Sequence, residues 1–142
     1  MNEITACPSC NKQNRVPSAA TGKPTCGACG AALPWIVDAT DASFDATVAT
    51  TLPVLVDLWA PWCGPCRMVT PLLEDLARQR AGHLKVVKVN VDDSPQIAAR
   101  YQVQGIPTLL LLNGGQLAAR QTGALSARAL TVWLDAHAPD AT

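Results

Sequence analysis

The stretch LPVLVDLWAPWCGPCR, residues 52–67, decides the fold of this chain. Its first half is a nearly continuous apolar run at residues 53–59, which predicts a central strand buried on both faces. A short turn follows, and then an apolar stripe with helical spacing that begins around Cys63. A buried strand that leads into a helix across a Cys-x-x-Cys sequence therefore forms the centre of the predicted fold.

Strand and helix signals continue after this stretch. We expect the helix to run from Cys63 to Gly82, with a kink at Pro71. A second buried strand is predicted at residues 84–91, followed by a short helix with Ser94 as its N-cap. Before the central stretch, a strand candidate is followed by another short helix, capped by Thr40 or Asp41.

The C-terminal third of the chain completes the pattern. An apolar strand, a turn at Asn113-Gly114 and a return strand predict a hairpin. The last helix opens at Ser126 and is expected to bury Leu130, Trp133 and Leu134. The predicted fold class is therefore α/β, a mixed central sheet flanked by helices on both faces.

Composition excludes several classes of partner. The chain has 11 basic and 11 acidic residues, so no overall field attracts it to nucleic acid or to an anionic membrane. No apolar run approaches the roughly 18 residues of a membrane span, and the N-terminus has no secretory pattern. We expect a cytoplasmic protein that binds neither nucleic acid nor membrane.

The six cysteines form three Cys-x-x-Cys pairs, and the first two pairs have the spacing of a zinc site. In the reducing cytosol, paired cysteines are better interpreted as metal ligands or redox catalysts than as structural disulfides. Four ligands would close a tetrahedral site, which predicts one structural Zn²⁺. The ligands of this predicted site are Cys7, Cys10, Cys26 and Cys29.

Residues 1–34 are poor in large apolar side chains, so a bound metal is expected to stabilise this small zinc-ribbon-like module. Gly27 and Gly30 suit its tight turns. Two alternatives stay open: two dithiols without a metal, and a nucleic-acid-binding zinc ribbon. The second lacks a basic stripe interleaved with aromatic residues.

The third pair, Cys63 and Cys66, has a different context. Unpaired N–H groups and the helix dipole at a helix start favour an anion, which lowers the thiol pKa and supplies a reactive thiolate. Cys66, one turn further along, is expected to be more buried than Cys63. The sequence therefore predicts a redox dithiol.

Residues 35–142 resemble the thioredoxin family. The resemblance rests on WAPWCGPC, on Asp57 before the first cysteine, on Pro71 after it, and on GIPT further along the chain. With the four-cysteine extension, the whole chain is similar to the zinc-containing bacterial members of the family. The resemblance implies a thioredoxin fold and a protein-disulfide reductase.

The same resemblance implies roles for individual residues. Cys63 matches the attacking thiolate and Cys66 the resolving thiol. Asp57 matches the buried carboxylate that accepts the Cys66 proton, and its pKa should be raised by desolvation. Lys88 matches the lysine near this carboxylate, and Pro107 matches a cis proline that faces the disulfide.

A substrate groove is also implied by the family. It would bind disulfide-containing client proteins, and its residues would be Trp59, Ala60, Pro61, Trp62, Gly64, Pro65, Gly105, Ile106, Pro107 and Gly123. No bound organic cofactor is implied, because an NADPH-dependent flavoprotein, thioredoxin reductase, would return the electrons. We expect a monomer, with Trp62 exposed and with His83 and His137 on the surface.

Two departures from the family pattern, Leu58 and Arg67, leave the predicted chemistry intact. Two other functions stay open at this point. One is a disulfide oxidase or isomerase, which an exported protein would favour. The other is a non-catalytic binding protein in which the zinc module captures a partner and the second domain is a scaffold.

Overall fold

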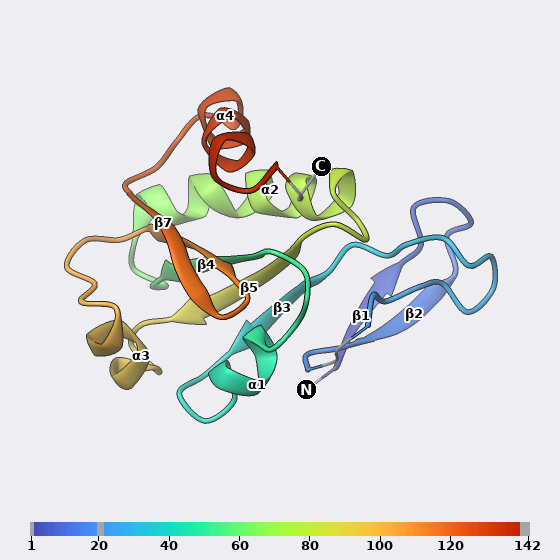
Figure 1. The fold of residues 1–142 in the computed structure, drawn as a ribbon, viewed down its shortest axis with the longest axis horizontal. Coiled ribbons are helices and arrows are strands. Elements are labelled where there is room, and N and C mark those ends of the chain that lie inside the picture. Colours follow the sequence, from blue (N-terminus) through green and yellow to red (C-terminus); the bar gives the residue numbers. More distant parts are fainter. Residues whose placement is uncertain (1, 20–21, 140–142) are drawn as a thin grey trace.

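A five-stranded mixed sheet forms the centre of the computed structural model, which describes residues 2–19 and 22–139 (Figure 1). Its strand order is β3-β5-β4-β6-β7; β3, β5 and β4 are parallel, and β6 and β7 are antiparallel to their neighbours. The strands are β3 (Ile36–Ala39), β4 (Val54–Trp59), β5 (Lys85–Asn90), β6 (Thr108–Asn113) and β7 (Gln116–Thr122). The predicted mixed α/β fold is confirmed.

Helices cover both faces of this sheet (Figure 1). On one face lie α2 (Gly64–Gln79) and α4 (Ala127–His137), whose leucines pack on the buried side chains of β4 and β6. On the other face lie α1 (Phe44–Val48) and α3 (Pro95–Arg100). β4 is buried along almost its whole length, as the apolar run predicts for a central strand.

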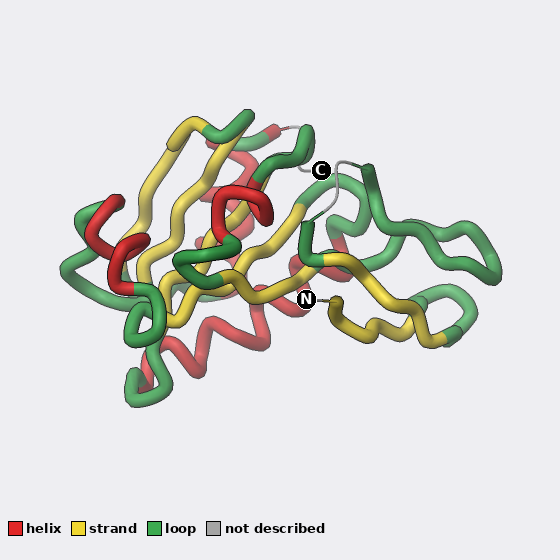
Figure 2. The backbone as a smooth tube through the Cα atoms, turned by 90° about the horizontal axis from the view of Figure 1, so that it is seen from below, coloured by secondary structure: helices red, strands yellow, loops and turns green. Residues whose placement is uncertain are grey.

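The N-terminal segment forms a separate lobe with its own two-stranded antiparallel sheet (Figure 2). Its strands are β1 (Asn2–Ala6) and β2 (Gln13–Pro17). Val16 and Leu33 are buried in the same apolar cluster as residues of the central sheet, and the Trp35 indole N–H donates to the Pro17 carbonyl. A bound metal would therefore not be the sole support of this segment, because the segment also packs on the larger domain.

A buried lysine joins the two parts of the chain. The Lys85 side chain is fully buried, and its ammonium donates to the carbonyl oxygens of Ser18 and Thr47 at 2.6 and 2.5 Å. The ammonium also lies 4.0 Å from the centre of the Trp35 ring. Desolvation lowers the pKa of Lys85 to about 8, and the two carbonyls and the ring face compensate part of the cost of burying a cation.

The prediction that Thr40 or Asp41 caps the first short helix is wrong. The N-cap of α1 is Ser43, whose hydroxyl accepts the N–H of Thr40. The Asp41 carboxylate instead accepts the N–H groups of Gln96 and Ile97, the orphan donors at the start of α3. Asp41 therefore caps a helix that lies far along the chain.

Two predicted boundaries also shift. The helix expected to reach Gly82 ends at Gln79, and Gly82, with φ of +84°, lies in the turn that leads to β5. The hairpin turns at Gly114-Gly115, one residue later than predicted, because both of these residues adopt positive φ. The predicted start is confirmed, since α2 begins at Gly64 with Cys63 as its N-cap, and the helix contains Pro71.

Other sequence predictions concern the surface. His83 and His137 are exposed, as expected, whereas Trp133 is half-buried beside the fully buried pair Leu130 and Leu134. Among residues 2–19 and 22–139, no helix has the length and apolar character needed to cross a membrane. The proposed domains, 1–34 and 35–142, include positions 1, 20, 21 and 140–142, which lie outside the described residues.

Candidate active site and metal centre

Cys63 and Cys66 form a disulfide at the start of α2, directly after β4 and its short turn. Their Cα atoms are 5.3 Å apart, and the backbone N–H of Cys66 points at the Cys63 sulfur, 3.2 Å away. Both residues are buried, with 4% and 2% exposed, so the expected difference in burial is small. Both sulfurs lie in the N-terminal turn of a helix, a position that favours a thiolate after reduction.

Asp57 lies in the middle of β4 and is fully buried. Neither of its carboxylate oxygens has a hydrogen-bond partner in the described part of the chain. Desolvation raises the pKa of Asp57 to about 6, and the charge of Lys88 opposes part of this shift. Lys88 is its register partner in β5, and the Lys88 ammonium lies 4.9 Å from the centre of the Trp59 ring.

The loop before β6 approaches the disulfide. The Ile106–Pro107 peptide bond is cis, and the Ile106 carbonyl oxygen lies 3.8 Å from the Cys63 sulfur. The Gly123 N–H donates to the Pro107 carbonyl at 2.8 Å, which joins the loop after β7 to this site. A Cβ at Gly105 would meet the Thr122 side chain at 3.2 Å, so the two loops pack closely.

The remaining groove residues lie around the disulfide with different exposure. Ala60 is buried with the two cysteines, and Trp59 is half-buried against them. Trp62 is 68% exposed, as the sequence predicts, and its indole N–H donates to Asp92 at 3.0 Å. The other predicted positions in this turn, Pro61, Gly64 and Pro65, are exposed.

Sequence reasoning missed part of this surface. A cavity of about 300 Å³ lies beside the disulfide, between the exposed Trp62, Ile106 and one face of α3. Its other lining residues are Val91, Pro95, Ala98, Val103 and Gln104. No local signal identifies these residues, because only the packing of α3 against the sheet brings them to the site.

The four remaining cysteines lie together in the N-terminal lobe. Their sulfurs are all within 4.8 Å of one another, and the pairs Cys7–Cys29 and Cys10–Cys26 are both at 3.6 Å. Four thiolates that bind one zinc tetrahedrally at ~2.3 Å would have sulfurs about 3.8 Å apart. The cluster can therefore hold a single tetrahedral metal ion.

Two turns of matching structure present these cysteines. In the first, the N–H of Asn11 donates to the Cys7 carbonyl; in the second, the N–H of Gly30 donates to the Cys26 carbonyl. Asn11 and Gly30 both have positive φ, whereas Gly27 does not, so only one of the two expected glycines serves the turn conformation. Both pairs thus reach the cluster centre through the same backbone geometry.

Neighbouring groups shift the pKa values of Cys26 and Cys10 in opposite directions. N–H groups of Cys29 and Ala28 lower the pKa of Cys26 to about 6. The Lys12 N–H lowers the pKa of Cys10, but the Cys26 thiol, desolvation and the other two thiols together raise it to about 12. Negative charge on adjacent sulfurs opposes further ionisation, and a divalent cation would offset this repulsion.

Comparison with known proteins agrees with this geometry. The family model described as thioredoxin matches residues 35–136. The chain is 48% identical over 99 residues to Thioredoxin 1 of a Nostoc species, covering 69% of this chain and 92% of the relative. It is 47% identical to the thioredoxin of Haemophilus influenzae, and the match covers 68% of this chain and 92% of that protein. It is 48% identical to the thioredoxin of Pseudomonas aeruginosa, and this match covers 72% of this chain and 95% of that protein. The chain therefore belongs to the thioredoxin family of protein-disulfide oxidoreductases.

Proposed function

We propose that this protein reduces disulfides in client proteins by thiol-disulfide exchange at Cys63 and Cys66. The observation that carries the proposal is the disulfide at the first turn of α2, beside the buried Asp57, in a chain of the thioredoxin family. The proposed catalytic residues are Cys63, Cys66, Asp57 and Lys88.

The reaction begins with the reduced dithiol. The Cys63 thiolate attacks one sulfur of the client disulfide and forms a mixed disulfide, while the other client sulfur leaves and takes up a proton. Cys66 then loses its proton and attacks the Cys63 sulfur, which releases the second client thiol. Two electrons pass to the client, and the enzyme is left with the Cys63–Cys66 disulfide.

Asp57 is proposed to accept the proton of Cys66. A carboxyl whose pKa is about 6 can take up and release a proton near neutral pH, unlike an ordinary aspartate. Burial without a hydrogen-bond partner produces this shift, and Lys88 limits it. Lys88 therefore keeps the carboxyl more ionised at a given pH than burial alone would allow.

The surface around the disulfide is proposed to bind the client chain. Its backbone at Gly105, Ile106 and Pro107 would pair with an extended client segment. The apolar rim would consist of Trp59, Ala60, Pro61, Trp62, Gly64, Pro65 and Gly123. This rim borders the cavity of about 300 Å³ beside Trp62, which can accept an apolar client side chain.

The four-cysteine cluster is proposed to hold one structural zinc ion through Cys7, Cys10, Cys26 and Cys29. Bound zinc would hold the four thiolates together and add its binding free energy to the stability of the lobe. A thioredoxin domain with this extension is similar to the zinc-containing bacterial thioredoxin 2, to which we assign the chain. Oxidation of the cluster is further proposed to release the metal.

The proposed partners follow from the reaction. Disulfide-containing proteins are the substrates, and an NADPH-dependent thioredoxin reductase would return electrons to the dithiol in the cytoplasm. A monomer suffices for this cycle, because one chain carries both cysteines and the acid.

Insulin reduction with dithiothreitol tests the proposed function. The wild type is expected to accelerate precipitation of the insulin B chain, and Cys63→Ser is expected to abolish the acceleration. Met68→Ser is the control, since Met68 is 71% exposed on the same helix and should retain full activity. Turnover by the Cys63→Ser protein would reject the mechanism.

A further inference from the structure

β3 lies at one edge of the central sheet, and its outer side has no strand partner among the described residues. The Val86 N–H donates to the Trp35 carbonyl, which fixes the alternation of the parallel ladder between β3 and β5. The N–H and C=O of Val37 consequently face β5. Those of Ile36 and Asp38 point outward, away from the sheet.

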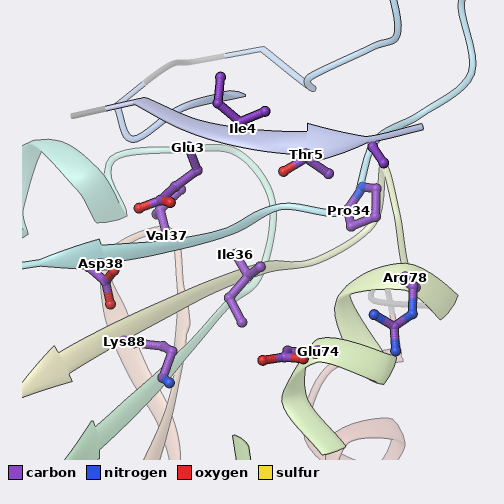
Figure 3. Close-up of a pocket in the computed structure, with 11 residues that line it drawn as sticks. Glu3, Ile4, Thr5, Pro34, Ile36, Val37, Asp38, Glu74, Arg78 and Lys88 are labelled. Carbon is purple, nitrogen blue, oxygen red and sulfur yellow. The ribbon is translucent and has the colours of Figure 1, made fainter. Parts of the chain in front are cut away.

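β1 runs past this outer edge without pairing to it (Figure 3). Its Glu3 and Thr5 side chains point toward the segment that contains Val37, and a cavity of about 480 Å³ separates the two elements. The cavity is lined by β1, by β3 and by two charged residues of α2, Glu74 and Arg78. We call this cavity the β1–β3 cleft.

Unpaired negative charge predominates in the β1–β3 cleft. Glu3, Asp38 and Glu74 line it, and none of them has an ion-pair partner within the described ranges. The two cations of the cleft have other neighbours: Arg78 pairs with Asp75, and the Lys88 ammonium lies over the Trp59 ring. The cleft is therefore suited to a cationic ligand.

A second cavity, of about 210 Å³, lies next to the cleft and shares the lining residues Asp38 and Lys88 with it. Trp59 and Ser94 also line this second cavity. The Trp59 indole N–H and the Ser94 hydroxyl are buried and have no hydrogen-bond partner in the part of the chain described here. Both atoms are also closed to solvent, so a ligand in this cavity would not reach them without a shift of the surrounding side chains.

We propose that an extended segment of a partner protein, rich in lysine or arginine, binds in the β1–β3 cleft as an added strand on β3. Its backbone bonds the outward N–H and C=O groups of Ile36 and Asp38. This site is separate from the proposed client groove, where chain pairing takes place around Pro107.

Charge distinguishes this occupant from a second copy of the same chain. Two copies joined edge to edge would bring Asp38 and Glu74 of each close to those of the other, and charged side chains at a sheet edge disfavour such pairing. Lysine or arginine at alternate positions of an added strand would instead face Asp38, because alternate side chains share one face of a sheet.

Amide NMR shifts of the intact, metal-loaded protein test the proposal. The probes are two acetylated seven-residue peptides, one alternating lysine with valine and the other alternating glutamate with valine. The lysine peptide is expected to shift the amide signals of Ile36 and Asp38 in a saturable manner. The glutamate peptide should leave these signals in place.

Two variants separate charge from backbone pairing. Asp38→Asn with Glu74→Gln should weaken binding about fivefold, or by about 1 kcal/mol, whereas Asp45→Asn, a carboxylate outside the cleft, should leave it unchanged. Ile36→Pro removes one outward N–H and should abolish the shifts. If the Ile36→Pro variant does not fold, the variant with Asp38→Asn and Glu74→Gln still tests the proposal.

Several outcomes would overturn the proposal. One is equal binding of both peptides, and another is a set of amide shifts confined to the loop around Ile106. A third is a shift of the Ile36 and Asp38 amide signals without peptide as the protein concentration rises, which would indicate self-association. Loss of reductase activity in Cys63→Ser has no bearing on these measurements, so the two proposals can fail independently.

Discussion

Asp57 and Lys88 lie opposite each other in the parallel strands β4 and β5, and the lysine charge and burial act on the Asp57 carboxyl in opposite directions. Desolvation raises the pKa of Asp57 and the Lys88 charge lowers it, with a net value of about 6 against an ordinary 3.8. Between these two pH values the folded protein binds more protons than the unfolded chain. The stability that this group contributes is therefore present below about pH 4 and is lost as the pH rises through about 6.

Asp57→Asn should therefore stabilise the oxidised protein at pH 8. The expected gain in the free energy of unfolding is roughly 3 kcal/mol, and it should fall toward zero near pH 3.5. Urea unfolding at both pH values measures it, with Asp93→Asn, an exposed carboxylate, as the control. A gain of equal size at both pH values would show that the charge of Asp57 is not its origin.

Cys66→Ser should trap the proposed mixed disulfide. The variant retains Cys63 as nucleophile but lacks the thiol that would release the client, so covalent adducts should accumulate and disappear on addition of dithiothreitol. Non-reducing electrophoresis with mass spectrometry identifies the adducts. The matched Cys63→Ser protein should give none, and adducts of similar yield there would assign the nucleophile to another cysteine.

The four-cysteine cluster should hold one zinc per chain after anaerobic preparation. Elemental analysis should find this metal in the wild type and in a Cys63→Ser/Cys66→Ser protein, but not in Cys26→Ser. Absence of zinc from the wild type would reject the proposed centre.

Asn14 should strengthen metal binding without touching the metal. Its side-chain N–H lies 3.5 Å from the Cys26 sulfur, and its amide oxygen accepts the Gly27 N–H at 3.0 Å. Asn14→Ala should lower zinc affinity about tenfold, the usual effect of losing such a supporting contact. Chelator competition measures the change, and Gln13→Ala, an exposed neighbour, should have no effect.

Asp41 should stabilise α3 and thereby the wall of the cavity beside Trp62. Asp41→Ala leaves the N–H groups of Gln96 and Ile97 without their acceptor, which should cost about 1 kcal/mol of stability. Because α3 carries Pro95 and Ala98 of that cavity, the apparent KM for insulin should rise more than kcat falls. Asp41→Asn keeps an acceptor and should restore both; if it does not, capping is not the cause.

The centre of the fold could be predicted from the sequence because its signals are local. The apolar run before Cys63 identified β4, and the Cys-x-x-Cys spacing at a helix start identified the redox pair. Asp57 was identifiable for the same reason, since a lone carboxylate within an apolar strand is costly to bury and therefore indicates a functional role.

Contacts between distant residues could not be predicted in this way. Asp41 stands next to one short helix in sequence but caps another, and the choice depends on how α1 and α3 pack together. Residues 1–34 contain few large apolar side chains, so the sequence did not indicate that Val16 and Leu33 would be part of a core. Their apolar partners belong to the other domain. The turn of the hairpin lies one residue later than predicted. Both Asn113-Gly114 and Gly114-Gly115 are residue pairs that can adopt positive φ, so the local sequence did not distinguish them.

The contacts of Lys85 cross residue 35, where the match to the thioredoxin family begins. The part of the chain that matches other thioredoxins begins there, yet the ammonium of Lys85 is satisfied by a carbonyl on each side of that boundary. A chain shortened to begin at Trp35 would keep every residue of the redox site but leave a buried cation with half of its acceptors. The segment that matches the family and the packed interior therefore have different limits in this molecule, because the N-terminal extension supplies part of the interior of the enzyme.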